Sequence, residues 1–255
     1  MNTFKTIVTQ LIYITLFFTI VSCVSDDASE SIQIENSPRL SQIIDNQIIE
    51  TGAVIACAAS DIDNSAIVHV YYYLEEGATN VQFFETNTLN VDQNDYSNYK
   101  KLAITSQPLY EGFIQQFIRP FELEQWIIIT FELNGEVKLS NPIRTKNISK
   151  ATVWTDDITV NQQTPKMPNF TWEHNANGDN EIYFQVVSTL DNGLLSGTYT
   201  YDNHFQYYNT SNVVLNITPE NPLMLTTGNS YKFLVMDVSE DNWVNTVFQS
   251  IFMAE

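Results

Sequence analysis

The most reactive side chains of this 255-residue sequence belong to its two cysteines, Cys23 and Cys57. Cys23 follows a basic start at Lys5 and a mostly apolar run over residues 6–20, which is typical of a secretory signal. This run is shorter than the roughly 20 residues that a membrane span needs. Cys57 lies in residues 53–59, which predict a buried strand where a thiol acts as a small hydrophobic group. We therefore expect no catalytic role for Cys57.

Residues Ile20-Val21-Ser22-Cys23 resemble the lipobox of bacterial lipoproteins: an aliphatic residue, two small or modest residues, and a cysteine. The resemblance implies that lipid is joined to the thiol of Cys23 and that the chain is cut before it, so that residues 1–22 are a signal peptide. The alternative is an uncleaved anchor helix with a chance cysteine. A lipid on Cys23 leaves Cys57 without a disulfide partner in this chain, in an oxidising compartment.

Residues 23–37 contain small and acidic side chains that bury little apolar surface, so we expect a flexible tether there. Ser25-Asp26-Asp27 resembles the signal that sends lipoproteins to the cell surface in Bacteroidota. A generic solvated linker is the alternative. The prediction is an outer-membrane lipoprotein that faces outwards.

The charge balance excludes some partners. Residues 1–22 hold one lysine and no acid, so the mature chain keeps 10 of the 11 basic residues against all 30 acidic ones, a net charge of −20. Such a chain is not expected to bind nucleic acid or an anionic membrane surface. Its expected contact with a membrane is the lipid on Cys23.

Motifs for catalysis or metal binding are missing from the sequence. The histidines His69, His174 and His204 show no spacing for zinc, and no nucleophile elbow, P-loop or dinucleotide motif occurs. The acidic segments 61–64 and 92–95 lack the glycine and final glutamate of a calcium loop, and turn chemistry explains both. We expect no cofactor, no metal and no enzymatic activity.

Aromatic residues beside predicted turns are the strongest sign of a binding surface. Flat rings on a polar surface can stack on sugars or anchor a protein partner, such as an envelope protein. The alternative is that these rings fill the sandwich ends or a domain interface. The candidate ligand-binding residues are Trp154, Tyr207, Tyr208 and Trp243.

The elements that must position these residues are mostly strands. β-Branched and aromatic runs alternate with turn residues, and Asn134-Gly135 predicts a tight hairpin. A one-sided apolar stripe makes residues 109–121 the best helical candidate, although Gly112 and Pro120 make a loop with a short helix an equal alternative. The predicted strands cover residues 67–74, 80–85, 126–133, 136–140, 181–190, 213–217, 231–238 and 244–252.

The C-terminal part resembles a fibronectin type III domain. Phe170-Thr171-Trp172 resembles its second strand with the core tryptophan, and Leu225 stands six residues before Tyr231, as in its tyrosine corner. The resemblance implies that the hydroxyl of Tyr231 bonds to the backbone of the preceding loop. Two departures are Thr227, where the family usually has proline, and Asp237, on the expected inward face of its strand.

That strand also has an apolar opposite face, made by Leu234, Met236 and Val238, and we expect another domain to cover it. Residues 38–147 resemble an immunoglobulin-like domain only loosely. The fold class is therefore all-β, with two tandem immunoglobulin- or fibronectin III-like β-sandwiches at residues 38–147 and 148–255.

These features predict a lipid-anchored lipoprotein of the outer membrane or cell surface with a non-catalytic binding or scaffolding role. The alternative is an accessory glycan-binding lipoprotein of a nutrient-uptake system. An enzyme on an unfamiliar β scaffold is a third hypothesis, which requires a cleft with paired carboxylates or a strongly perturbed titratable group.

Overall fold

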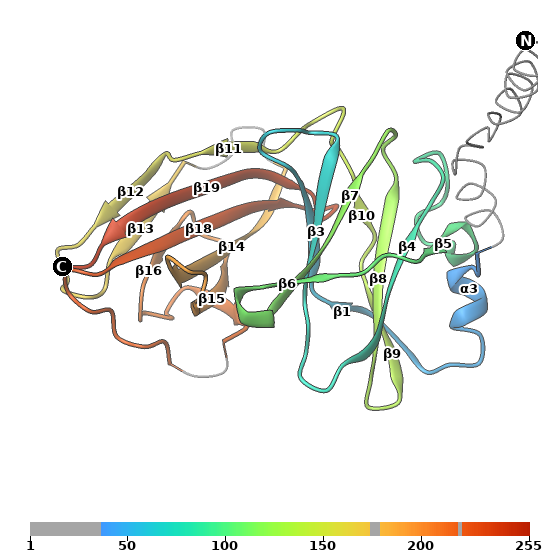
Figure 1. Cartoon of the computed structure of the whole chain (residues 1–255), viewed down its shortest axis with the longest axis horizontal. Helices are drawn as coiled ribbons and strands as arrows, with labels where there is room; N and C mark the ends of the chain where they lie inside the picture. Colours follow the sequence, from blue (N-terminus) through green and yellow to red (C-terminus); the bar gives the residue numbers. More distant parts are fainter. Residues whose placement is uncertain (1–36, 174–178, 219–220) are drawn as a thin grey trace, which may run out of the picture. The chain divides into compact units, whose positions relative to one another are not determined.

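The computed structural model describes residues 37–173, 179–218 and 221–255. β-Strands dominate these residues, as Figure 1 shows. The helical pieces in the described ranges are short: α3 (Leu40–Ile43) and 3₁₀ turns at Tyr96–Asn98 and Tyr110–Gly112. None of the described helices is long and apolar enough to cross a membrane. The predicted signal peptide, Cys23 and residues 23–36 of the predicted tether lie outside the described residues.

The first sandwich packs Val70 of one sheet against Phe83 and Ile129 of the other. The larger sheet has the order β1 (Ile49–Val54), β9 (Glu136–Ser140), β8 (Trp126–Leu133), β4 (Thr79–Glu85) and β5 (Lys100–Leu102), with β10 (Ile143–Arg144) also paired to β8. The smaller sheet has the order β2 (Ala56–Ser60), β3 (Ile67–Tyr73), β7 (Ile114–Pro120) and β6 (Gln107–Leu109).

The second sandwich is centred on Phe170 and Phe233, whose rings stack with centroids 3.8 Å apart. Its larger sheet has the order β11 (Val153–Thr155), β19 (Val244–Met253), β18 (Ser230–Ser239), β14 (Asn180–Thr189), β15 (Leu194–Thr200) and β17 (Val213–Asn216). The smaller sheet has the order β12 (Ile158–Asn161), β13 (Asn169–Trp172) and β16 (His204–Gln206). The predicted all-β sandwich fold is confirmed.

Both sandwiches begin in the same way. In the first, β1 runs parallel to β9, and the chain then changes sheets at Ile55 so that β2 pairs antiparallel with β3. In the second, β11 runs parallel to β19, and β12 pairs antiparallel with β13. The first two strands of each sandwich therefore belong to different sheets, and the short chain between them links those sheets.

The tyrosine corner of the second sandwich is present. The backbone nitrogen of Thr226 donates a hydrogen bond to the hydroxyl oxygen of Tyr231 at 3.0 Å, and Leu225 is buried. Tyr231, Phe233 and Val235 alternate into the sandwich core, as the sequence predicts. Strand order and corner together make this sandwich fibronectin type III-like.

The hairpin predicted at Asn134-Gly135 is confirmed. Both residues have positive φ angles, 54° and 83°, and they join β8 to β9. A two-residue hairpin turn of this kind needs positive φ at both positions, which asparagine and glycine tolerate best.

The helical candidate at residues 109–121 is wrong beyond its first turn. The 3₁₀ turn at Tyr110–Gly112 is followed by β7, which pairs with β3 on one side and with β6 on the other. Pairing on both sides satisfies the backbone of β7 and outweighs the helical spacing of its apolar residues.

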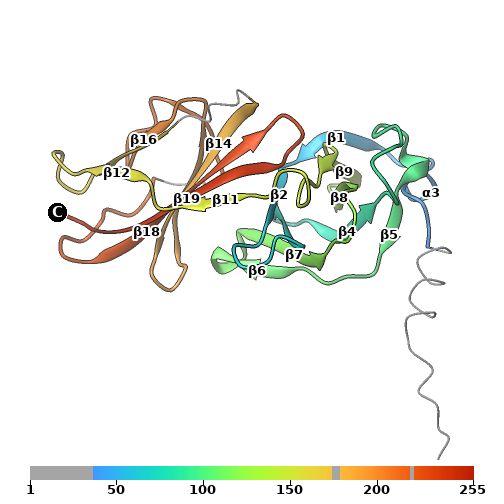
Figure 2. The same cartoon turned by 90° about the horizontal axis from the view of Figure 1, so that it is seen from above.

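The apolar outer face of β18 is covered by the first sandwich, as expected. Met236 and Val238 belong to one buried cluster with Ala59, Tyr71 and Ile114 of the first sandwich. Residues 37–255 accordingly form one compact unit. Figure 2 shows the end of β2 beside the start of β11, where the two sandwiches meet.

Candidate functional site

The predicted lipid-attachment residue, Cys23, and the segment Ser25-Asp26-Asp27 lie outside the described residues. The lipid anchor therefore stays a prediction from the sequence.

Trp243, one of the four aromatic candidates, is part of the domain interface. It comes from the turn between β18 and β19, and its side chain is fully buried in the core of the first sandwich. Its indole Nε1 donates to the carbonyl oxygen of Lys150 at 2.8 Å. The backbone nitrogen of Ala58 donates to the carbonyl oxygen of Asn242 at 3.0 Å. With no exposed surface, Trp243 offers no face to a ligand.

Trp154 lies at the same interface. It is half-buried in the cluster between the sandwiches, and its Nε1 donates to the carbonyl oxygen of Ser60 at 3.0 Å. Both tryptophans therefore connect the second half of the chain to the first. This is the interface role that the sequence left open as the alternative to sugar binding.

Tyr207 and Tyr208 lie at another part of the second sandwich. Tyr207 is fully buried in its core, and its hydroxyl donates to the carbonyl oxygen of Leu223 at 2.6 Å. Tyr208 is 42% exposed. Because the four candidates belong to different buried clusters or lie at the surface, they do not form one aromatic platform.

His69 and the two acidic segments have local structural roles. Nε2 of His69 lies 3.1 Å from a carboxylate oxygen of Asp61, and Nδ1 lies 3.0 Å from Oε1 of Gln116. Backbone nitrogens donate to the carboxylates of Asp61, Asp92 and Asp95, as in ordinary polar turns. Among the described residues, no group of three or more His, Cys, Asp or Glu side chains could hold a metal ion. His174 lies outside the described residues, and His204 is exposed.

Glu85 is a buried carboxyl group with a strongly raised pKa. Its residue is 5% exposed, and Oε1 lies 2.9 Å from a guanidinium nitrogen of Arg119. Burial raises the pKa of Glu85 to about 7, against the opposing effects of Arg119 and Lys100. Both charged neighbours are cations, so this group does not have the paired carboxylates that glycoside hydrolysis requires.

A polar hollow of about 630 Å³ lies between Lys146, Asp179 and Asp241. Nζ of Lys146 lies 2.8 Å from Asp241, and Nζ of Lys150 lies 2.5 Å from Asp179. The first ion pair joins the end of the first sandwich to the second, and the other joins the connecting segment to the second. These pairs give the hollow a structural role.

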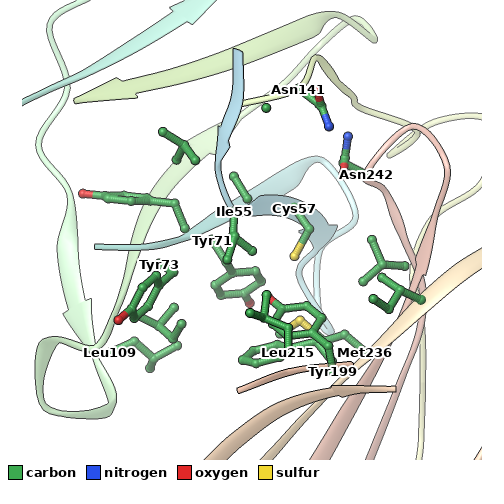
Figure 3. A pocket seen from close by; sticks show the side chains of 18 residues that line it. Ile55, Cys57, Tyr71, Tyr73, Leu109, Asn141, Tyr199, Leu215, Met236 and Asn242 are labelled. Atoms are coloured by element: carbon green, nitrogen blue, oxygen red, sulfur yellow. The ribbon is translucent and has the colours of Figure 1, made fainter. Parts of the chain in front are cut away.

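The strongest candidate site is an apolar cavity of about 220 Å³ between the sandwiches (Figure 3). Strands β2 and β3 supply one wall, and β14, β15 and β18 supply another. Its lining residues include no aspartate, glutamate, lysine, arginine or histidine, although the chain is strongly acidic. Burying a charge in such a space is costly, so the cavity favours a neutral occupant.

The polar side chains at the cavity are a thiol, phenols and the amides of Asn141 and Asn242. Figure 3 shows the sulfur of Cys57 directed towards Tyr199 and Met236. Cys57 is not in a disulfide, and burial raises its pKa to about 12. Burial, followed by the charge of Cys57, raises the pKa of both Tyr71 and Tyr199. The thiol and both phenols are therefore neutral at physiological pH.

Local sequence patterns do not predict this cavity. The apolar outer face of β18 is the signal that points to it, since Met236 and Val238 line the cavity. Tyr71 and Tyr199 come from strands far apart in the sequence, and only the packing of the two sandwiches brings them together.

The comparisons with known proteins leave the family open. No family model and no curated protein matches the sequence. The glycoside hydrolase domain of Endo-D from Streptococcus pneumoniae R6 is 10% identical, with a TM-score of 0.33 over 78% of this chain and 33% of that one. The chain thus spans about a third of that protein's length.

Two further solved structures have similar values. The FN1–FN3 domains of chicken CNTN1 are 9% identical, with a TM-score of 0.28 over 81% of this chain and 68% of that one. The fibronectin(III)-like modules of Clostridium thermocellum CbhA are 9% identical, with a TM-score of 0.22 over 82% of this chain and 90% of that one. At such low similarity, no activity follows for this chain.

Proposed function

We propose that this chain is a lipoprotein of a Bacteroidota-type outer membrane, held by lipid on Cys23 and facing the cell surface, with a non-catalytic binding or scaffolding role. The observation that carries the scaffolding role is the position of Trp243, a residue of the second sandwich buried in the core of the first. This insertion joins the two sandwiches, so that they are presented beyond the tether as one body.

The chemistry of the described residues supports a non-catalytic role. Glu85 has a raised pKa, but it is buried beside two cations. Cys57 is a neutral thiol, and a thiol attacks as the thiolate. Neither group has the geometry of a nucleophile or a general acid.

The glycan-binding alternative receives less support. Stacking on a sugar needs an exposed ring face, whereas Trp243 and Tyr207 are fully buried and Trp154 is fixed at the interface. Of the four candidates, only Tyr208 keeps a substantial exposed surface. One ring is a weak basis for a sugar platform.

Protease treatment of intact cells tests the anchor and its orientation. We expect the wild-type protein to fractionate with membranes and to be digested on intact cells. We expect Cys23→Ala to carry no lipid and to be absent from the lipid-modified proteins of the membrane fraction. A periplasmic marker protein must stay intact in the same cells. Protection of the wild-type chain until lysis would contradict surface exposure, and unchanged lipid labelling of Cys23→Ala would contradict the anchor.

The non-catalytic part needs its own measurement. The purified chain is incubated with soluble envelope glycans and with peptides, and new reducing ends or new amines are quantified. We expect neither product above the level given by heat-denatured chain. Sustained release of either product would overturn this part of the proposal.

A further inference from the structure

We propose that the cavity between the sandwiches is a binding site for a small, uncharged molecule with an apolar body and one hydroxyl or carbonyl group. This site goes beyond the proposed scaffolding role and does not depend on the lipid anchor. Three features support this site: the size of the cavity, the neutrality of its walls and the phenol groups that line it.

Size sets the scale of the ligand. An apolar protein cavity of about 150 Å³ can hold benzene. The cavity here measures about 220 Å³, which leaves room for roughly ten non-hydrogen atoms. A single substituted ring or a short branched chain fits this volume.

The side chains that line the cavity favour a ligand whose main part is apolar. Ile55, Leu109 and Ile114 of the first sandwich face Phe184, Leu215 and Met236 of the second across the cavity. These side chains make no demand for hydrogen bonds, and the lining holds no charged group. An ionic ligand would lose its hydration without gaining a counter-ion, so the site selects neutral molecules.

Two phenol groups indicate where the hydroxyl or carbonyl group of the ligand would lie. Tyr71 is only 9% exposed, yet its hydroxyl makes no hydrogen bond with any described residue. Tyr199, whose ring stacks on Phe184 at 4.6 Å, likewise has a hydroxyl without a partner in the described ranges. Neither hydroxyl oxygen is among the fully buried unpartnered atoms of the described residues, so each keeps some accessible surface, and both residues line the cavity. A ligand hydroxyl or carbonyl at the Tyr71 and Tyr199 end can therefore pair with them.

The test uses 4-fluorophenol and fluorobenzene as probes, since they differ by one hydroxyl. The full chain is kept in phospholipid nanodiscs, because detergent tails compete for an apolar cavity. Methyl carbons of methionine are labelled with ¹³C for NMR, so that Met236 reports from the cavity wall while Met224 and Met253, both largely exposed, report non-specific contact. We expect saturable shifts of Met236 alone.

Variants then test the role of the two hydroxyls separately from the presence of the apolar site. Tyr71→Phe/Tyr199→Phe removes both hydroxyls and is expected to reduce the preference for 4-fluorophenol over fluorobenzene by roughly five-fold, while fluorobenzene still binds. Tyr73→Phe is the matched control, since the hydroxyl of Tyr73 points away from Cys57 in Figure 3. Its preference should equal that of the wild type, measured in the same nanodiscs so that partitioning into lipid cancels.

Filling the cavity must abolish the shifts. Cys57→Phe does so from the first sandwich, and Leu215→Trp does so from the second if the first variant fails to fold. Shifts of Met236 that do not saturate, or that appear equally at Met224 and Met253, overturn the site. An equal probe preference in wild type and Tyr71→Phe/Tyr199→Phe overturns the assignment of the polar group.

Discussion

Ser60 and Thr152 bind each other through a reciprocal pair of hydrogen bonds across the domain interface. The backbone nitrogen of Ser60 donates to Oγ1 of Thr152 at 2.9 Å, and the backbone nitrogen of Thr152 donates to Oγ of Ser60 at 2.8 Å. Oγ1 of Thr152 also donates to the carbonyl oxygen of Val244 at 2.8 Å. One hydroxyl thus connects β2 of the first sandwich, the segment between the sandwiches, and β19 of the second.

Replacing that hydroxyl should destabilise the whole unit. In Thr152→Val the buried nitrogen of Ser60 loses its acceptor, which costs about 1–3 kcal/mol of unfolding free energy. Urea denaturation followed by circular dichroism measures the loss. Thr159→Val, at an exposed position of β12, is the matched control and should leave the midpoint nearly unchanged. Equal midpoints for both variants would contradict the role of Thr152.

Removing the ring of Trp243 should have a larger effect. Trp243→Ala leaves a cavity in the first sandwich and frees the carbonyl of Lys150, at a cost of about 3–5 kcal/mol. We also expect faster trypsin cleavage after Lys150, read from the fragment masses. Tyr201→Ala, which removes a 62% exposed ring, serves as the control. Unchanged cleavage at Lys150 would show that Trp243 does not fix this segment.

Glu85 should make stability fall as the pH rises. Its folded pKa of about 7 lies above the ordinary value of 4.5, so the fold favours the protonated form. That contribution is complete below about pH 4.5 and is lost as the pH rises through about 7, by up to about 3 kcal/mol.

The measurement compares the wild type with Glu85→Gln at several pH values across this window. We expect the wild type to lose stability relative to Glu85→Gln as the pH rises, because Arg119 stays charged in both chains. Glu122→Gln, at an exposed position, controls for the removal of one acid from a very acidic chain. If the difference in unfolding free energy between the wild type and Glu85→Gln stays constant across this pH range, the raised pKa of Glu85 is contradicted.

Cys57 should react slowly with thiol reagents. With a pKa of about 12 in place of 9.0, its thiolate population at neutral pH is about 1,000-fold lower. Methyl methanethiosulfonate forms a mixed disulfide with the thiolate and releases methanesulfinate. In Cys23→Ala, where Cys57 is the remaining cysteine of the sequence, labelling followed by mass spectrometry should be far faster in concentrated urea than in buffer. Similar rates in both conditions would rule out suppression by the fold.

Local signals in the sequence predicted much of the fold. Asn134-Gly135 was sufficient for one hairpin, because the conformational demand of the turn is met by the two residues themselves. Leu225 and Tyr231 were sufficient for the tyrosine corner, because both partners lie within one short loop. The apolar outer face of β18 indicated a covering domain, since exposed apolar strands are rare on single domains.

Contacts between distant segments could not be predicted from local patterns. Residues 109–121 carry helical spacing, but β7 forms because β3 and β6 are available on either side of it. Trp154 and Trp243 lie beside predicted turns in the sequence, which left both an exposed ring and a ring buried at a domain interface open for them. Their partners, Ser60 and the core around Val68, come from the other sandwich and are invisible in local patterns.

The burial of Trp243 within the first sandwich also constrains how the chain is made. The first sandwich ends at β10 near residue 144, but its core lacks one large side chain until residue 243 has been synthesised and delivered. We therefore expect folding of the first sandwich during synthesis to remain incomplete until Trp243 packs, because this contact has a high sequence separation. A chain truncated before Trp243 should therefore have a destabilised first sandwich as well as an incomplete second one.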